Sequence, residues 1–520
     1  MMMGTKNNKR HQMSINLFAN ILALLINMGI SFFLVPYVTK NVGEEAYGFV
    51  TLGNNFVNYV SMVTISLNAM SGRFVTIAVH RKEYDKANRY YSSVFYANLF
   101  IIAIIIIPLI CIVWRMEYIL NVPITIVQDV KILWMFIFVN LFISLAGTVF
   151  GISTFCANRL DLSAKRNVEA NLLKMVVVFI MFINLRPSVW YWGFAIMLSG
   201  MYIILTNIYY AHKLIPEMKI SRNNFSLKSI IEILKAGVWN SVSRVGAVAL
   251  TEFDVLLANL IISPKMMGMM ALSKTLPTYV TSLTSNITNV FMPSLTIEYA
   301  KSGDNPGKLI KEVKLSIRVL LFFHCIVYGL LFGFFDCLYS VWMPSQKNNI
   351  KEIYIIGLIS ISGCFISAVA SIVMNIFTVI NKLKLASLSI VITGMVSLPV
   401  TVLLANITEN DMSRGCIIAG VSVVLVAVRC IFFLIPYAGI CIGGKWYTFF
   451  NDLLLNIAAV LFSILIAMGV KLFLRPESWL ELIKAGSIAF VFISIVDFVV
   501  VLPEQGKYIL KNKVKGFLNR

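Results

Sequence analysis

An apolar segment early in the chain reads SSVFYANLFIIAIIIIPLICIVW, at residues 92–114, and contains no charged residue. It exceeds the roughly 20 residues that an α-helix needs to cross the hydrocarbon core of a bilayer. Similar segments recur along the 520 residues, of which 59% are hydrophobic and 13% are charged. Soluble domains average roughly 45–50% apolar and 25% charged residues, so a soluble core could not absorb this surface. The sequence therefore predicts an all-α, polytopic membrane protein.

The predicted spans number about fourteen when apolar runs are matched to this length. Six are expected near residues 13–38, 49–78, 92–114, 131–155, 170–185 and 189–211. Six more are expected near residues 236–263, 268–298, 316–341, 353–379, 386–405 and 415–440. A final pair is expected near residues 452–474 and 483–502. The fifth span is short, and its bounds are the least well defined by the apolar pattern.

The net charge of +20 could suggest nucleic acid, but the basic residues form short clusters between apolar runs, which indicates membrane topology. With the connections assigned alternately to two sides, 28 of the 44 Lys and Arg residues lie on the side of both termini, 10 lie on the other side and 6 lie within spans. Positive loops favour the cytoplasm, so both termini are predicted to be cytoplasmic. The run from Met13 to Val38 has no small-residue cleavage site, so it is predicted to be a retained helix rather than a signal peptide.

The connections between spans are short, and the longest polar one covers about residues 212–235. None can form a folded catalytic domain, so the protein is not expected to be an enzyme, and its function is expected inside the helix bundle. The eight cysteines are scattered through apolar segments, with no CxxC pattern and no nearby His at ligand spacing. They are interpreted as small hydrophobic residues, and neither a metal nor a cofactor is predicted.

A shift of the chain by 220 residues aligns the first helix of each six-helix set without a gap. The aligned identical pairs are Asn20 with Asn240, Gly48 with Gly268, and Tyr59 with Tyr279. The shift keeps both halves in the same orientation, as a parallel duplication requires. We therefore expect an N-terminal lobe at 13–211, a C-terminal lobe at 236–440 and an appended helix pair at 452–502.

Polar and small residues recur at three- and four-residue steps on the first and seventh predicted helices, so each set forms one stripe. The first stripe contains Asn16, Asn20, Ala23 and Asn27, and the second contains Asn240, Arg244, Ala247, Thr251, Asp254 and Ala258. Such stripes can also serve only to pack helices, and that alternative stays open for the uncharged residues. A charge inside a span costs at least roughly 2.5–3.5 kcal/mol on insertion scales, so it normally faces the bundle interior or a wet cavity.

Three basic residues, Arg244, Lys274 and Arg429, lie within the predicted spans of the second lobe. Arg244 is about eight residues into its helix, roughly 12 Å at 1.5 Å per residue, which is too deep for easy contact with the interface. Guanidinium groups offer planar paired donors to an oxyanion, and an ammonium group offers a mobile charge. The candidates for binding an anionic cargo are therefore Arg244, Lys274, Arg429, Asn240, Asn20 and Asn27.

An internal ion pair is the alternative for Lys274, because Asp254 is expected near the outer end of helix seven and Lys274 near the outer start of helix eight. Such a pair would leave a gating role open. Asp254 is therefore a candidate for gating or coupling, together with Glu252 and Asp497.

Other buried charges have simpler explanations. Arg73, Lys174 and Lys471 are placed near helix ends, where a long side chain can extend to the interface. His324 is a lone histidine at a predicted helix start, and it is interpreted as a packing residue.

Two segments of the sequence resemble a known family. The first has VPY at residues 35–37, VGEEAYG at 42–48 and NAMSGRF at 68–74, and the second has FDVLL at 253–257, SP at 263–264 and ALSK at 271–274. They resemble the polysaccharide transporter family, which includes O-antigen and capsule repeat-unit flippases. This family belongs to the multidrug/oligosaccharidyl-lipid/polysaccharide exporter superfamily. Helix eight departs from the usual Gly-x-Tyr pattern, because Gly268 is followed by Met269 and Met270.

The resemblance implies two six-helix lobes around a central cavity, alternating access, and an undecaprenyl-pyrophosphate-linked oligosaccharide as cargo. It implies a bacterial inner membrane location, with membrane lipids as partners and a polysaccharide polymerase and glycosyltransferases as candidate partners. In this superfamily the two extra C-terminal helices are thought to shelter a lipid tail.

Three other functions compete with this interpretation. A lipid II flippase is the nearest rival. A multidrug antiporter of the same superfamily would favour buried carboxylates, whereas the deep charges here are mainly basic. A membrane polymerase or glycosyltransferase would need a large outer loop or an acidic metal-binding motif, and neither is visible in the sequence.

Overall fold

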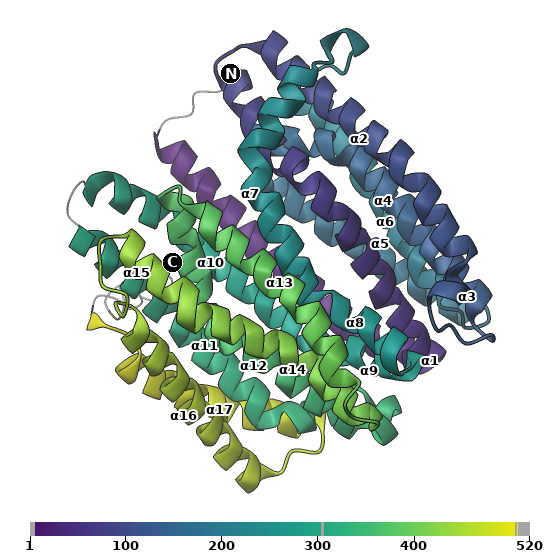
Figure 1. The fold of residues 1–520 in the computed structure, drawn as a ribbon, viewed down its shortest axis with the longest axis vertical. Coiled ribbons are helices and arrows are strands. Elements are labelled where there is room, and N and C mark those ends of the chain that lie inside the picture. Colours follow the sequence, from purple (N-terminus) through teal and green to yellow (C-terminus); the bar gives the residue numbers. More distant parts are fainter. Residues whose placement is uncertain (1–5, 303–305, 505–506, 508–520) are drawn as a thin grey trace. The chain divides into compact units, whose positions relative to one another are not determined.

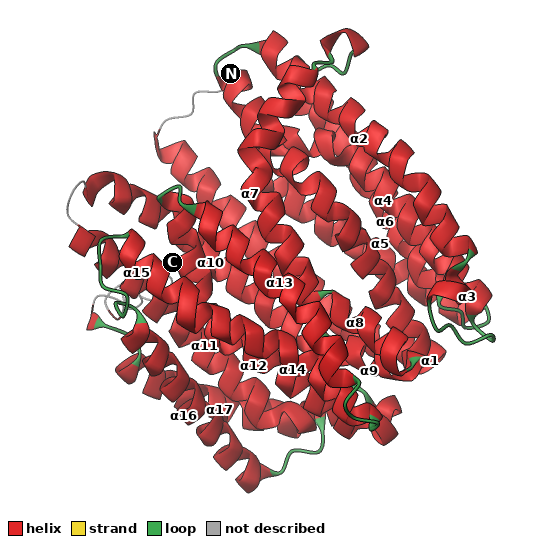
Figure 2. Cartoon of the chain, viewed as in Figure 1, coloured by secondary structure: helices red, strands yellow, loops and turns green. Residues whose placement is uncertain are grey.

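The computed structural model describes residues 6–302, 306–504 and 507, and this part of the chain is helical with no strand (Figures 1 and 2). A backbone in lipid has no water to bind its N–H and C=O groups, and a helix satisfies them internally. The all-α membrane fold is thus confirmed. The predicted cytoplasmic ends at 1–5 and 508–520, and part of the predicted cytoplasmic loop at 303–305, lie outside the described residues.

Six helices precede the long central connection: α1 (Lys6–His80), α2 (Tyr84–Trp114), α3 (Met116–Ile119), α4 (Val127–Cys156), α5 (Leu160–Asn184) and α6 (Trp190–Leu214). The next elements are the 3-10 helix η1 (Arg222–Asn224), α7 (Leu227–Thr251), α8 (Phe253–Leu257), the π-helix η2 (Ala258–Ile262), α9 (Pro264–Ser273) and α10 (Thr275–Ser302).

The remaining elements begin with α11 (Pro306–Trp342), the 3-10 helix η3 (Pro344–Asn349), α12 (Ile350–Val379) and α13 (Leu383–Ala405). They continue with α14 (Asp411–Arg429), the π-helix η4 (Cys430–Leu434), α15 (Ile435–Cys441), α16 (Phe450–Leu474) and α17 (Trp479–Val500).

Twelve helices of the described residues are long and apolar enough to cross a membrane. One of them, Phe18–His80, is 63 residues long, and its backbone turns at Gly43 with φ 83° and ψ 165°. Only glycine adopts that conformation readily, so α1 can contain the two spans predicted at 13–38 and 49–78. α10 is 28 residues long, but its many hydroxyl and amide side chains make it more polar than the twelve. Counting α1 twice and adding α10 gives the fourteen crossings expected from the sequence.

Several predicted spans begin too late in the sequence. The fifth, expected at 170–185, is α5 from Leu160, and the seventh, expected from 236, is α7 from Leu227. Likewise α2 begins at Tyr84 instead of 92, and α11 at Pro306 instead of 316. Apolar runs mark only the part of a helix that lies in hydrocarbon, whereas the helix itself continues through its charged first turns.

The chain forms two compact units. The first contains the residues up to Val248 together with Val255–Ala271, and the second contains Ala249–Asp254 together with the residues from Leu272 onward. The chain therefore passes from one unit to the other within α7, α8 and α9. The division into two six-helix lobes and an appended pair stays a prediction.

Small residues hold α4 and α6 together in the first unit. Gly193 faces the backbone of Leu133, and Gly147 faces the side chain of Ile204, each so closely that an added Cβ would lie within 2.8 Å. Glycine removes the side-chain volume that would separate two helices, and this is how membrane helices approach closely.

In the second unit, α16 and α17 pack against α11, as Figure 1 shows in green and yellow. Arg318 near the start of α11 forms an ion pair with Asp452 at 2.9 Å, and Lys471 near the end of α16 forms one with Asp336 at 2.6 Å. Ion pairs thus join α11 and α16 near both ends. Lys471, which was predicted to extend to the interface, has a carboxylate partner, and its interface position stays a prediction.

Candidate functional site

The first part of α7 contacts the second half of α1 in the first unit. Ser241 Oγ donates a hydrogen bond to Ser66 Oγ at 2.8 Å, and Gly237 lies against the backbone of Ser66. Farther along α7, Arg244 Nη2 donates a long hydrogen bond of 3.4 Å to Asn58 Oδ1. The bond occupies one of the five N–H donors of the guanidinium group. This arrangement places the predicted polar stripe of α7 against polar residues in the second half of α1.

Arg244 lies farther along its helix than the sequence indicated. α7 begins at Leu227, so Arg244 follows the first residue of the helix by seventeen positions, or roughly 25 Å at 1.5 Å per residue. Asn240 is half-buried one turn earlier on the same face of the helix. Polar and charged side chains within a span normally face the bundle interior or water, so this face needs a polar occupant or water.

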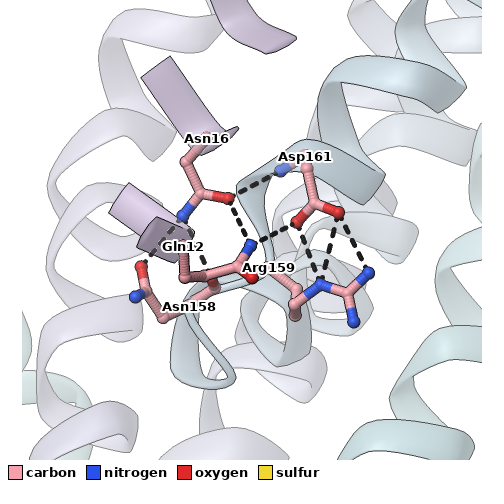
Figure 3. Close-up of polar contacts among 5 residues, drawn as sticks. All are labelled: Gln12, Asn16, Asn158, Arg159 and Asp161. Atoms are coloured by element: carbon pink, nitrogen blue, oxygen red, sulfur yellow. Dashed lines mark hydrogen bonds and ion pairs between the residues drawn. The ribbon is translucent and has the colours of Figure 1, made fainter. Parts of the chain in front are cut away.

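The asparagines of the predicted stripe on the first helix lie in two different environments. Asn16 belongs to a hydrogen-bonded cluster, which Figure 3 shows. Asn16 Nδ2 donates to the carbonyl of Asn158 at 2.9 Å, and Asn16 Oδ1 accepts from the backbone N–H of Asp161 at 3.1 Å. Gln12 bridges Asn16 and Asp161, and the Asp161 carboxylate, through its hydrogen bonds, raises the pKa of the Arg159 guanidinium. This cluster anchors the start of α1 to the turn between α4 and α5.

The other two asparagines of this stripe lie outside the anchor. Asn20 is exposed and donates to the backbone carbonyl of Asn16 at 2.7 Å. Asn27 has a buried Oδ1 atom with no hydrogen-bond partner among the described residues. A buried acceptor without a partner is uncommon in proteins and normally has a ligand or water. Asn27 therefore remains the stronger candidate for contacting cargo.

In the second unit, two helix breaks face each other across one ion pair. Glu252 is the single turn residue between α7 and α8, and Lys274 is the single turn residue between α9 and α10. Lys274 Nζ forms an ion pair with Asp254 and donates to the carbonyl of Thr251 at 2.9 Å. The ammonium group therefore satisfies the C-terminal end of α7 as well as a carboxylate. Broken helices in transporters form the binding sites of substrates and ions.

A polar face continues from this break along α10. The side chains of Thr278, Thr281 and Ser285 are exposed and recur at three- and four-residue steps. Thr278 Oγ1 donates to the carbonyl of Lys274, and Thr281 Oγ1 donates to the carbonyl of Pro277. A hydroxylated exposed face in a membrane helix is expensive against lipid, so it indicates a wet surface.

Arg429 is the last residue of α14, directly before the π-helix η4. It lies eighteen positions into the span Asp411–Cys441, close to its middle. Its Nε and Nη1 atoms are buried and have no hydrogen-bond partner within the described part of the chain. π-helical turns occur often at functional sites, because they shift the side chains that flank them. Arg429 therefore combines unused donors with a local distortion of its helix.

Asp497 lies elsewhere in the second unit. Its side chain is 1% exposed within the packing of α16 and α17, and it accepts a hydrogen bond from Ser463 Oγ at 3.3 Å. The structure thus brings Asp254, Glu252 and Lys274 together at one break, whereas Asp497 belongs to the helix pair that packs on α11.

The sequence profile of the family described as polysaccharide biosynthesis protein matches residues 15–296, which is more than half of the chain. The chain belongs to this family. A relative in Bacillus subtilis (strain 168), the uncharacterized membrane protein EpsK, is 26% identical over 511 residues, covering 97% of this chain and 99% of EpsK. The predicted resemblance to polysaccharide transporters is confirmed.

Solved structures of two other kinds of protein share the fold. The lipid II flippase MurJ in an inward closed conformation has a TM-score of 0.60 and 13% identity, covering 94% of this chain and 98% of that chain. An inward-facing multidrug resistance MATE family transporter of the MOP superfamily has a TM-score of 0.57 and 13% identity, covering 81% of this chain and 94% of that chain. This member of the polysaccharide biosynthesis protein family therefore has a MATE- and MurJ-like membrane fold.

Lys174 is the residue that the sequence interpretation misplaced. It was expected near a cytoplasmic helix end because the fifth span was read from 170, but α5 runs from Leu160 to Asn184. Lys174 is therefore near the middle of its helix and not at a helix end. The charged segment LDLSAKRNVEA at 160–170 hid the first ten residues of the helix from a hydropathy reading.

Proposed function

We propose that the protein is a flippase that carries an undecaprenyl-pyrophosphate-linked oligosaccharide repeat unit across a bacterial inner membrane by alternating access. The translocated repeat unit would be used to build a surface polysaccharide such as O-antigen or capsule. One observation carries the proposal: two guanidinium groups within the spans have donors that the protein leaves unused. Arg429 has two buried nitrogen atoms without hydrogen-bond partners among the described residues, and Arg244 uses one donor in its bond to Asn58.

The chemistry of the cargo matches these groups. A pyrophosphate presents several anionic oxygens, and guanidinium donors bind such oxygens in pairs with charge-assisted hydrogen bonds. Sugar hydroxyls need partners that both donate and accept, and the exposed face of Thr278, Thr281 and Ser285 provides hydroxyls of that kind. The polyprenyl chain can stay in lipid, because it needs no polar partner.

A multidrug antiporter for organic cations fits the structure less well. A cationic cargo needs a carboxylate that is available to it, but Asp254 is already paired with Lys274. Asp497 is enclosed by α16 and α17. A lipid II flippase stays a second candidate, because the MurJ structure shares the fold and because lipid II also presents a pyrophosphate. The two cargoes differ in their sugar and peptide groups, not in the part that the arginines would bind.

The proposal is tested by complementation of a strain that lacks the gene. Arg244→Ala should abolish surface polysaccharide while the protein level in the membrane stays near normal, and Arg244→Lys should restore it only partly because the paired geometry is lost. Arg222→Ala, at an exposed position in η1, is the matched control and should export normally. A well-expressed Arg244→Ala variant with normal surface polysaccharide would exclude an essential anion-binding role for this residue.

A further inference from the structure

A partly open cavity of about 270 Å³ lies between α4, α5 and α6 of the first unit. Its walls carry an unusual share of polar side chains for the middle of a membrane helix bundle: Asn140, Ser144, Thr148, Asn171, Lys174 and Asn207. Polar residues at this depth are expensive unless they face one another, water or a bound group. None of these residues belongs to the candidate site described above.

Lys174 supplies a positive charge to this cavity. It lies fourteen residues after the start of α5 and ten before its end, which is roughly 15–20 Å from either end at 1.5 Å per residue. Its Nζ atom is 5.3 Å from the centre of the Trp192 ring. No carboxylate lies within ion-pair distance of Lys174 among the described residues. A cation–π contact offsets only part of the cost of burying an ammonium group, so a counter-anion is expected.

Asn140 supplies a buried acceptor to the same cavity. Its Oδ1 atom has no hydrogen-bond partner among the described residues, and it occupies the place where a side chain on Gly200 would begin. Two neighbouring polar groups are satisfied: Asn171 Nδ2 donates to Asn167 O at 2.9 Å, and Ser199 Oγ donates to Ala170 O at 2.9 Å. The unmet requirements of the cavity are therefore a negative partner for Lys174 and a donor for Asn140.

We propose that this cavity binds a hydroxyl-bearing oxyanion, meaning a phosphate or carboxylate with a neighbouring hydroxyl group. The oxyanion contacts Lys174, and the hydroxyl donates to Asn140 Oδ1. A water molecule takes about 30 Å³ of liquid volume, so the space is large enough for a headgroup-sized molecule and not merely for one water or ion. The inference depends on the packing of α4, α5 and α6 and not on the proposed cargo.

Two sources could supply this chemistry, and one experiment separates them. The purified full-length protein is placed in nanodiscs of phosphatidylcholine alone, and its thermal unfolding midpoint is measured with increasing glycerol phosphate in solution. A parallel series replaces part of the phosphatidylcholine with phosphatidylglycerol. A ligand that binds only the folded state raises the midpoint. A rise in the first series identifies a free anion, and a rise in the second series alone identifies a lipid headgroup.

If the ligand binds in the cavity, substitution of a residue that lines the cavity must reduce the rise in the unfolding midpoint. Lys174→Met should weaken the apparent affinity about tenfold or more, because a charge-assisted bond is lost, and Lys174→Arg should retain most of it. Lys213→Met is the control for general surface attraction, because Lys213 is exposed at the end of α6, and it should behave as the wild type does.

Asn140→Ala retains the positive charge of Lys174, and this variant tests the proposal if Lys174→Met does not fold. It should weaken binding by a smaller factor than the loss of the ammonium group. The proposal is overturned if neither probe raises the wild-type midpoint, or if Lys174→Met and Asn140→Ala both respond as the wild type does. In that case Lys174 is held by Trp192 and packing alone.

Discussion

Gly48 and Gly268 lie in direct contact, and a Cβ atom on Gly48 would be only 2.9 Å from Gly268 Cα. These two residues are also equivalent under the 220-residue shift of the sequence. A residue that touches its own equivalent is characteristic of a position beside a two-fold axis. The internal duplication, which was inferred from a few matching residues, stays a prediction.

Gly48→Ala and Gly268→Ala should each destabilise the protein by about 1–3 kcal/mol, because an inserted methyl group must displace backbone atoms at both positions, and at Gly48 the Met267 side chain as well. Gly29→Ala is the matched control, since nothing lies within 4 Å of a Cβ at that position of α1. Thermal unfolding in nanodiscs measures the difference. Equal midpoints for Gly48→Ala and Gly29→Ala would show that the contact is looser than the structure indicates.

The Asp254–Lys274 pair should behave as a coupled unit. Their side chains are 8% and 18% exposed, so removal of one partner leaves a buried charge. Asp254→Leu or Lys274→Met alone should cost about 3–5 kcal/mol, whereas the double variant should recover much of that loss. Reversible unfolding in detergent, analysed as a double-mutant cycle, measures the coupling. Additive losses would contradict the pair.

Substitution of Arg429 should abolish transport without lowering the stability of the protein. Because its Nε and Nη1 atoms have no partner, Arg429→Met should leave the unfolding midpoint unchanged or raise it, while export of the cargo is lost. A structural arginine would show the opposite pattern, with a large loss of stability and residual export in the molecules that fold. Membrane protein level, unfolding midpoint and surface polysaccharide are measured on the same cells.

The orientation in the membrane is tested by cysteine labelling of a cysteine-free variant. Asn223→Cys lies in the polar connection predicted to be cytoplasmic, and Ile124→Cys lies in the connection predicted to be on the outer side; both positions are exposed. In intact cells an impermeant thiol reagent should label position 124 and not position 223. Labelling at position 223 and not at position 124 would contradict the predicted orientation and indicate the opposite one.

The fold class followed from the sequence because apolar length is a strong constraint in lipid. The first residues of the helices could not be predicted in this way, because α5 and α7 each begin with charged helical turns that precede the apolar run. The Asp254–Lys274 pair was foreseen as an alternative, because spacing placed both near the same end of adjacent helices. Two features were not foreseeable, namely the π-helix after Arg429 and the partnerless Asn140, because both depend on tertiary packing.

His324 is a second case in which the apolar run did not locate the start of the helix. It was expected at a helix start, but α11 begins at Pro306, so His324 lies well inside the helix. It is buried and forms a 2.8 Å hydrogen bond with Thr284 of α10. Its interpretation as a packing residue agrees with this environment, although its position along the helix was wrong. The bond links two helices whose contact could not be read from either segment alone.

The most direct measurement is the movement of an undecaprenyl-pyrophosphate-linked oligosaccharide across vesicles that contain only the purified protein. Translocation is followed by the fraction of sugar headgroups that an externally added glycosidase can cleave over time. We expect wild-type vesicles to equilibrate the headgroup between leaflets, Arg244→Ala and Arg429→Met vesicles to remain at the protein-free rate, and Arg222→Ala vesicles to match the wild type. Wild-type vesicles that move the lipid-linked oligosaccharide no faster than protein-free vesicles would contradict the proposed flippase activity.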